Sequence, residues 1–270
     1  MDIEKLFDLS GRVAVVSGAA GNFGGATAEV LAEAGADLLL LDIDQGGVER
    51  RADEIGTTTG RRVVAQRCDV TSLTDIDEVF ATIDSEFGRV DVLANYAGPA
   101  VLGPPEEIAI ADLASTINGI AVARFYLCQL TGRRMLAAGK GSIINAGSVA
   151  SLTAMGRGHI AYSMSMGAVA QMTRELSTEW SSRGVRVNAI LPGQVLNQHL
   201  KERIDADPDL EQRFLRGLPI GRIGNRDDIK GLALFLASDA SSFVTGALIP
   251  MDGGNLAKNA GGSHPGMPTL

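Results

Sequence analysis

Residues 13–24 read Val-Ala-Val-Val-Ser-Gly-Ala-Ala-Gly-Asn-Phe-Gly, and this stretch decides the expected fold. A short run of β-branched residues, typical of a buried strand, passes directly into a turn of small residues and then into a helical stretch. Small residues let the backbone turn tightly, and the following helix offers free N–H groups and a positive dipole end to a pyrophosphate. A glycine-rich turn is a weak signal when it stands alone, because many strand-to-helix turns contain glycine.

Outward from this turn, apolar runs alternate with helical stretches along the whole chain. This alternation predicts an α/β fold, a single-domain doubly wound (Rossmann-like) parallel sheet of about seven strands with helices on both faces. Strands are expected at VAVVSG, DLLLLDI, RVVAQRCDV, VDVLANYAG, GSIINAGS, VRVNAILPG and GALIPMDGG, and helices at 22–34, 45–58, 74–87, 107–137, 162–182 and 226–237.

No linker divides the chain. Residues 1–256 are therefore expected to form one dinucleotide-binding and catalytic domain, followed by a flexible tail at 257–270 that is rich in Gly and Pro. The polar stretch 194–219 interrupts the alternation after the sixth strand. It is either a flap over a ligand or surface decoration.

Composition narrows the classes of function. The net charge of −8 argues against nucleic acid or an anionic membrane as a partner. Cys68 and Cys128 are too few for a disulfide framework or a Cys-rich metal site, and no metal is expected. The N-terminus lacks the basic start and apolar run of a signal peptide, and no apolar stretch approaches the ~20 residues that span a bilayer. We expect a soluble, cytoplasmic protein.

Acidic residues end the second and third expected strands. Asp42 lies about 20 residues beyond the turn, where a carboxylate accepts the adenosine ribose hydroxyls; the alternative is a helix cap. Its charge repels a 2′-phosphate, and no Arg or Lys lies in the turn or at Ile43 and Asp44, which favours NAD(H) over NADP(H). Asp69 is placed either to read an adenine edge or to cap the next helix.

Further motifs follow in order: Asn95-Tyr96-Ala97-Gly98, Asn118, Ser148 and Tyr162. With them the chain resembles the short-chain dehydrogenase/reductase family, from about Leu9 to Gly254. The resemblance includes VRVNAILPG at 185–193 and FLASDASSFVTGALIPMDGG at 235–254. It implies a doubly wound domain, a nicotinamide dinucleotide, a homotetramer or homodimer, and reversible oxidation of a secondary alcohol to a ketone.

The resemblance also implies roles for single residues. Tyr162 would exchange a proton with the substrate oxygen, Ser148 would hydrogen-bond that oxygen, and Asn118 would hold a helix kink and a water of the proton relay. The expected cofactor-binding residues are Gly18, Gly21, Asn22, Phe23, Gly24, Asp42, Ile43, Asp69, Val70, Asn95, Ala97, Gly98, Pro192, Gly193, Val195 and Asn197.

Four positions depart from the family pattern. Asn22 replaces a glycine of the turn, which is mild because asparagine tolerates left-handed backbone angles. Tyr96 replaces an asparagine and is expected to change packing near the cofactor. Asn197 stands for a threonine that contacts the nicotinamide amide, and its side chain keeps both a donor and an acceptor. Met166 stands where the family carries its active-site lysine.

Met166 is the serious departure. A tyrosine side chain has a reference pKa near 10, and a neighbouring ammonium favours its ionised form. Methionine supplies neither charge nor donor, so much of the typical 10²–10⁴-fold gain from positioned acid–base catalysis is expected to be lost. His159 is a candidate substitute; the alternative is a histidine that simply faces solvent.

Three functions remain open on the sequence. The first is an NAD-dependent dehydrogenase for a polyol, a sugar derivative or a hydroxyacyl compound. The second is an NAD(H)-binding sensor without chemistry, and the third is a non-redox, lyase-type member using Ser148 and Tyr162. Apolar stripes on 107–137 and 162–182 predict contacts with further copies of the chain, or a purely internal packing role.

Overall fold

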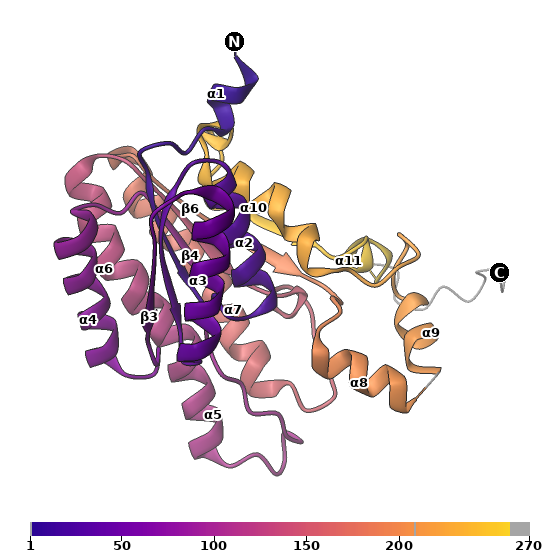
Figure 1. The fold of residues 1–270 in the computed structure, drawn as a ribbon. Coiled ribbons are helices and arrows are strands. Elements are labelled where there is room, and N and C mark those ends of the chain that lie inside the picture. The colour runs from indigo at the N-terminus through magenta and orange to yellow at the C-terminus, as the bar shows by residue number, and fades with distance from the viewer. Residues whose placement is uncertain (1, 208, 260–270) are drawn as a thin grey trace.

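The computed structural model describes residues 2–207 and 209–259, and these form one seven-stranded sheet with helices on both faces (Figure 1). All strand pairs are parallel, in the order β3-β2-β1-β4-β5-β6-β7. The predicted fold class is confirmed. The strands are β1 Val13–Ser17, β2 Asp37–Asp42, β3 Val63–Arg67, β4 Val92–Asn95, β5 Gly141–Ala146, β6 Val185–Pro192 and β7 Leu248–Met251.

The helices lie at nearly the positions that the sequence predicts. They are α1 Ile3–Phe7, α2 Asn22–Glu33, α3 Gln45–Thr59, α4 Leu73–Thr82, α5 Ile110–Ile117, α6 Ala123–Ala138, α7 Ile160–Trp180, α8 Gln198–Ala206, α9 Asp209–Leu215, α10 Lys230–Ala237 and α11 Asn255–Asn259.

Alternate strand residues face two separate cores, as the period of two in a pleated strand requires. Ala14 and Val16 of β1 pack with α2, α3 and α10 on one face of the sheet. Val15, between them, packs with α4, α6 and α7 on the other face. Because both faces are covered, β1 is buried along its whole length and β2 is buried between its two end residues, and both read as apolar runs.

Three stretches show detail beyond the expected elements, and the helices in the second of them agree with the helical character expected there. The expected helix 107–137 is broken by a π-helical turn at Asn118–Val122, between α5 and α6. The polar stretch 194–219 contains two helices, α8 and α9. The helix α11 extends to Asn259, three residues past the expected start of the tail. The rest of the tail, 260–270, lies outside the described residues.

The strand order reverses at β1, which has β2 on one side and β4 on the other. In an open parallel sheet the chains leave β1 and β4 toward opposite faces, which opens a crevice at their carboxyl ends. The glycine-rich turn follows β1 and the Asn95–Gly98 segment follows β4, so both meet at this crevice.

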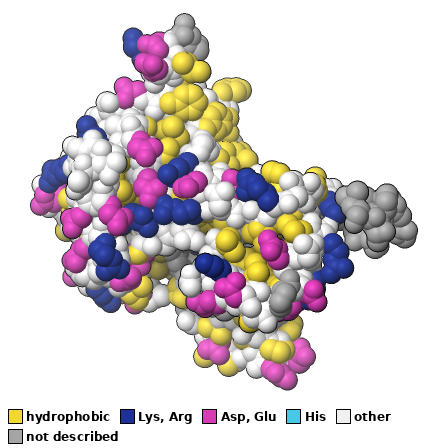
Figure 2. All heavy atoms as spheres, turned by 45° about the vertical axis from the view of Figure 1, so that its right-hand side comes forward, with side chains coloured by type: hydrophobic (Ala, Val, Ile, Leu, Met, Phe, Trp, Pro, Cys, Tyr) yellow, Lys and Arg dark blue, Asp and Glu magenta, His cyan; other side chains and the backbone are white. Residues whose placement is uncertain are grey.

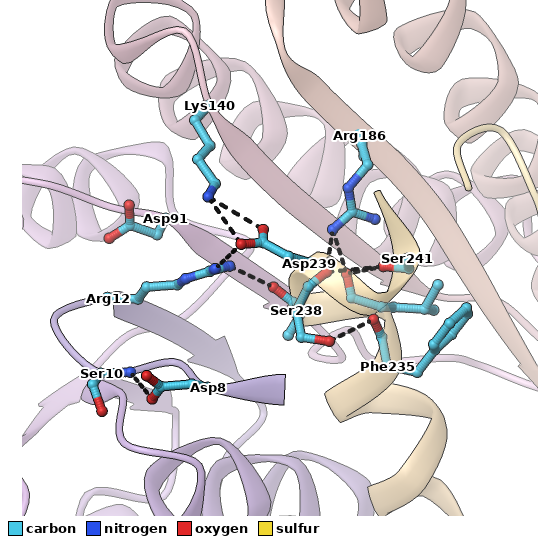
Figure 3. A network of polar contacts seen from close by, with 12 residues as sticks. Asp8, Ser10, Arg12, Asp91, Lys140, Arg186, Phe235, Ser238, Asp239 and Ser241 are labelled. Atoms are coloured by element: carbon cyan, nitrogen blue, oxygen red, sulfur yellow. Dashed lines mark hydrogen bonds and ion pairs between the residues drawn. The ribbon is translucent and has the colours of Figure 1, made fainter. Parts of the chain in front are cut away.

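The opposite, amino-terminal edge of the sheet is closed by a network of ion pairs (Figure 3). Arg12, just before β1, and Lys140, just before β5, both pair with Asp239 at 2.7 and 3.2 Å. Arg186 of β6 donates to the carbonyl oxygens of Leu236 and Ser238 at 2.8 and 3.1 Å. Burial opposes ionisation of Asp239, but its bonds to Lys140 and Arg12 outweigh burial and hold the pKa below its usual value.

Asp239→Asn is expected to lower the free energy of unfolding at pH 7 by about 0.5–1 kcal/mol, because Asp239 is half exposed and screened. The pKa of Asp239 is lower in the folded protein than in the unfolded chain, where it is near 3.9. The stabilisation is therefore present above pH ~3.9 and disappears as the pH falls through the pKa of the folded state. Denaturant melts of both proteins from pH 7 down to about pH 3 measure the difference. Asp53→Asn, at an exposed position of α3, is the control, and equal losses in both variants would contradict the assignment.

Candidate functional site

The glycine-rich turn is held too tightly for larger side chains. Gly18 has a left-handed backbone (φ +72°), and a Cβ there would lie 3.1 Å from the Ala97 nitrogen. A Cβ on Gly24 would lie 2.1 Å from the Gly18 carbonyl oxygen, so the first turn of α2 packs directly on the loop. Gly21 is the N-cap of α2 and no side chain caps it, which leaves the first N–H groups of the helix free for an anion.

Asn22 is accommodated in a way that the sequence did not predict. It is the first residue of α2 and has an ordinary negative φ, so its tolerance of left-handed angles is not used. Its Nδ2 instead donates to the carbonyl oxygen of Leu196 at 3.3 Å. This bond joins the glycine-rich turn to the segment that follows β6.

Asp42 ends β2 with its carboxylate oriented by backbone N–H groups. The Ala20 nitrogen donates to Oδ2 at 3.0 Å and the Asp44 nitrogen donates to Oδ1 at 3.1 Å. The cap of α3 is Asp44, so the helix-cap alternative for Asp42 does not hold. Each Asp42 oxygen keeps acceptor capacity for a hydroxyl. The following residue, Ile43, is 60% exposed beside it.

The Asp69 side chain forms hydrogen bonds within its own turn. Its Oδ1 accepts from the Thr71 nitrogen and hydroxyl at 2.9 and 2.7 Å, while Ser72 caps α4. The helix-cap alternative for Asp69 is therefore also wrong. Val70, the next residue, is buried in the core beneath this turn.

Ser17 and Asn95 join the carboxyl ends of β1 and β4. The buried Ser17 hydroxyl donates to Asn95 Oδ1 at 3.0 Å and accepts from the Tyr96 and Ala97 nitrogens. Gly98 has φ +152°, and a Cβ there would lie 2.9 Å from the Gly119 carbonyl oxygen. The side chain of Asn95 is thus fully engaged in shaping the crevice floor.

Ser148 and Tyr162 lie on two elements that one hydroxyl connects. Ser151 Oγ accepts from the Ser148 nitrogen at 3.3 Å and donates to the carbonyl oxygen of Met166 at 2.9 Å. This ties the segment after β5 to α7, one helical turn beyond Tyr162. Ser148 Oγ accepts from the Ala150 nitrogen, and among the described residues none accepts its hydroxyl hydrogen. That hydrogen is free for a ligand.

An apolar cluster lies behind the partly buried Tyr162. Met166 is 3% exposed and packs with Ile120, Ala150 and Val169, and the Tyr162 ring packs against the same group. Asn118, expected to take part in a proton relay here, begins the π-helical turn but is exposed. The helix kink that Asn118 was expected to hold is the π-helical turn that begins at this residue, and Ile120 of the same turn packs in the cluster with Met166.

The loop before α7 positions His159 beside Tyr162. Arg157 is the only non-glycine residue with positive φ in the described chain, and Gly156 and Gly158 flank it with the same sign. His159 Nδ1 lies 2.8 Å from the Gly156 carbonyl oxygen, so in the neutral ring Nδ1 carries the hydrogen. Its ring meets that of Tyr162 edge-on, with centroids 6.1 Å apart.

The segment after β6 borders the site on its far side. The Gly193 nitrogen donates to the Met251 carbonyl oxygen, next to Pro192 at the end of β6. Val195 bridges to Gly224, and Asn197 Oδ1 caps α8 by accepting from the Leu200 nitrogen at 2.8 Å. The Asn197 amide nitrogen remains for a ligand. A cavity of about 330 Å³ opens here, lined by Gln194, Val195, Leu218, Ile220, Arg222, Gly224, Asp228, Pro250, Met251, Asp252, Gly253 and Gly254.

Surface charge and metal ligands give no competing site. Figure 2 shows acidic and basic side chains interspersed over the face that it presents. Within 2–207 and 209–259 no group of three or more His, Cys, Asp or Glu side chains is placed to hold a metal ion. The same part of the chain contains no helix with the length and apolar character that a membrane crossing requires.

Comparison with known proteins agrees with this geometry. Residues 18–255 match a family model described as enoyl-(acyl carrier protein) reductase. The chain is 38% identical to D-threitol dehydrogenase of Mycolicibacterium smegmatis, over 96% of this chain and 98% of that protein. It is 36% identical to NAD-dependent glycerol dehydrogenase of Listeria innocua, over 94% and 98%. A gluconate 5-dehydrogenase of Burkholderia cenocepacia, solved with NADP and tartrate, superposes with a TM-score of 0.88 at 28% identity, covering 95% of this chain and 99% of that one.

Met166→Lys is expected to lower the free energy of unfolding by about 1–3 kcal/mol, because the new ammonium enters a buried cluster of mainly apolar side chains. Met166→Leu is the matched control and should cost less than about 1.5 kcal/mol, since it conserves volume. Denaturant melts at pH 7 compare the two. A lysine variant as stable as the leucine variant would mean that the cluster admits water.

Proposed function

Because the chain belongs to the short-chain dehydrogenase/reductase family, we propose that it interconverts a secondary alcohol of a polyol or sugar derivative and the corresponding ketone, with NAD(H). The observation that carries the proposal is the tie, through Ser151 and the Met166 carbonyl oxygen, between the segment that carries Ser148 and the helix that carries Tyr162. Both lie on the side where the glycine-rich turn offers an uncapped helix end.

The chain's own groups are suited to hold the substrate oxygen and move one proton. Ser148 has a free hydroxyl hydrogen to donate to that oxygen, and its own oxygen is fixed by the Ala150 nitrogen. Tyr162 is partly open to solvent and takes or gives the proton. A bound nicotinamide dinucleotide supplies the hydride acceptor or donor.

The residues present fit such a dinucleotide. Gly18 and Gly24 leave a cradle that a Cβ would fill, and Gly21 opens α2 without a capping side chain. Asp42 would accept the ribose hydroxyls and repel a 2′-phosphate. Arg51, a nearby cation, is already paired with Glu29 at 2.9 Å. These features support NAD over the NADP seen in the Burkholderia enzyme.

The proposed substrate class rests on the relatives and on the mixed walls of the site. Threitol and glycerol are polyols, and both named dehydrogenases align along nearly their full length. Exposed Leu102, Leu152 and Leu196 would line an apolar side, and His159 would offer a polar group. A hydroxyacyl substrate remains compatible with the apolar side.

We also propose that further copies of the chain cover part of α5, α6 and α7, as a homotetramer or homodimer. Ile110, Phe125 and Met164 on these helices and Val122 of the π-helical turn are between 40% and 77% exposed. Leu176 and Trp180 belong to the same stripe but pack into the core on the face of the sheet that α4, α6 and α7 cover. These two residues therefore have an internal packing role.

The apolar surroundings of Met166 favour one second candidate, an NAD(H)-binding sensor without chemistry. Ile120, Ala150 and Val169 place no charge behind Tyr162. The intact turn and Asp42, by contrast, count against the non-redox, lyase-type function, because they fit a dinucleotide.

The test of the function is NADH formation from a panel of polyols, and NADH consumption with the matching ketoses, by the parent and by Tyr162→Phe. The variant should lose about 10²–10⁴-fold in kcat while still binding NADH, because only the proton transfer is removed. Tyr126→Phe is the control, since Tyr126 on α6 bonds Asp77. NADH binding without turnover of any alcohol or ketone would leave the sensor as the function.

Asp42→Ala tests the cofactor. It removes a charge from the ribose site, so the ratio of kcat/KM for NADP⁺ over NAD⁺ should rise at least about tenfold. Asp44→Asn removes a neighbouring charge while keeping a good N-cap for α3, and should change the ratio much less. An unchanged ratio in Asp42→Ala would show that the adenosine ribose binds elsewhere.

A further inference from the structure

The side chain of Asn22 joins two segments that border the crevice and follow different strands. Asn22 is the first residue of α2, directly after Gly21, and its Nδ2 donates to the Leu196 carbonyl oxygen at 3.3 Å. In the sheet, β4 and β5 lie between β1, which leads into α2, and β6, which leads to Leu196. A ligand that contacts both Asp42 at the end of β2 and Ser148 after β5 has to cross the ends of β1 and β4 alongside this bond.

The segment that Asn22 holds leads directly into α8, a helix with few buried contacts. Asn197 caps α8, and among the described side chains of this helix only Leu200 is buried. Ile204 is partly buried and the others are exposed. Figure 1 shows α8 standing out from the body of the domain. Because little apolar surface anchors α8, the bonds at its amino end largely fix its position.

The base of this segment is held to α2 more firmly. Backbone bonds of 2.9 and 3.0 Å join residues 194–196 to Gly224. The chain just beyond Gly224 is tied to α2 through Glu29, whose carboxylate pairs with Arg226 and, at 2.9 Å, with Lys230. These bonds and ion pairs form a fixed base. The side-chain amide bond at the start of α2 is a single, exposed contact, so it can open while the base stays in place.

We propose that Asn22 is a latch: its bond to Leu196 holds residues 196–206 closed beside the crevice, and a dinucleotide enters and leaves while this bond is open. The role in dinucleotide exchange rests on the proposed function, whereas the closed position of α8 does not. Glycine, which the family pattern has at this position, offers no amide for such a bond. Asn197, another departure from that pattern, lies on the latched segment, so two of the four departures belong to one structural unit.

Hydrogen exchange measures the latch without cofactor or substrate. In Asn22→Ala, deuterium uptake by a peptide covering 196–206 should become about three- to tenfold faster, the factor expected from losing one net hydrogen bond. Peptides of β5 should exchange as in the parent, which would show that the fold is intact. Gln45→Ala is the matched control, because Gln45 is likewise the exposed first residue of a helix and bonds Glu49 of that same helix. Unchanged uptake by 196–206 in Asn22→Ala would overturn the proposal.

Asn22→Asp separates the donated bond from simple packing. Aspartate has nearly the size of asparagine but replaces the amide donor with an oxygen, which cannot donate to the Leu196 carbonyl. Residues 196–206 should therefore exchange about as fast in Asn22→Asp as in Asn22→Ala. Exchange as slow as in the parent would mean that the bulk of the side chain holds the segment, and the latch would be refuted.

NADH binding followed by stopped flow tests the role in exchange. In Asn22→Ala the rates of NADH association and dissociation should both rise about three- to tenfold while the Kd stays within about twofold, because a latch limits passage in both directions. If Asn22 instead contacted the dinucleotide, dissociation alone would quicken and the Kd would rise. That outcome, or two unchanged rates, would overturn the proposal. A protein that binds no NADH would contradict the proposed function, and the hydrogen exchange of 196–206 would still decide whether the latch exists.

Discussion

The hydrogen bonds that join Ser17 to the end of β4 set the geometry on which the rest of the site depends. One hydroxyl orients Asn95 and also holds the two residues that follow it, so the carboxyl ends of β1 and β4 are fixed at the point where the strand order reverses. Gly18 can then approach Ala97 closely, and α2 starts at the crevice with its first N–H groups free. The backbone, more than any side chain, builds this half of the site.

The other half is governed by where charge can reside. Helix α7 brings Tyr162 to the same edge of the sheet but surrounds Met166 with apolar side chains, so this position of the helix carries no charge. Helix α6 carries a guanidinium held by three carbonyl oxygens of the strand ends. The strand ends thus hold the positive charge of Arg124 beneath the crevice, whereas Met166 places none on α7.

Sequence reasoning succeeded where a backbone pattern determines the outcome. The fold follows from alternating apolar runs, and the carboxylate at the end of β2 follows from its distance to the turn, although the bonds that orient Asp42 were not foreseen. It failed where contacts between residues far apart in the chain decide the outcome. The bond of Asn22 to the Leu196 carbonyl oxygen and the packing of Ile120 with Met166 are of this kind, and no local pattern indicates either. The burial of Arg124 gave no signal, because an arginine on a helix normally faces water.

The ion-pair network at the amino edge of the sheet has a consequence for the order of folding. Arg12 and Asp239 are separated by 227 residues, so their contact joins the first strand to the end of the last long helix. Contacts between such distant residues incur a large loss of chain entropy before they gain any energy, and chains dominated by them fold slowly. During synthesis, the first strand must therefore wait for nearly the whole chain to emerge before its charged end finds a partner. Until then Arg12 remains hydrated, and this edge of the sheet stays open.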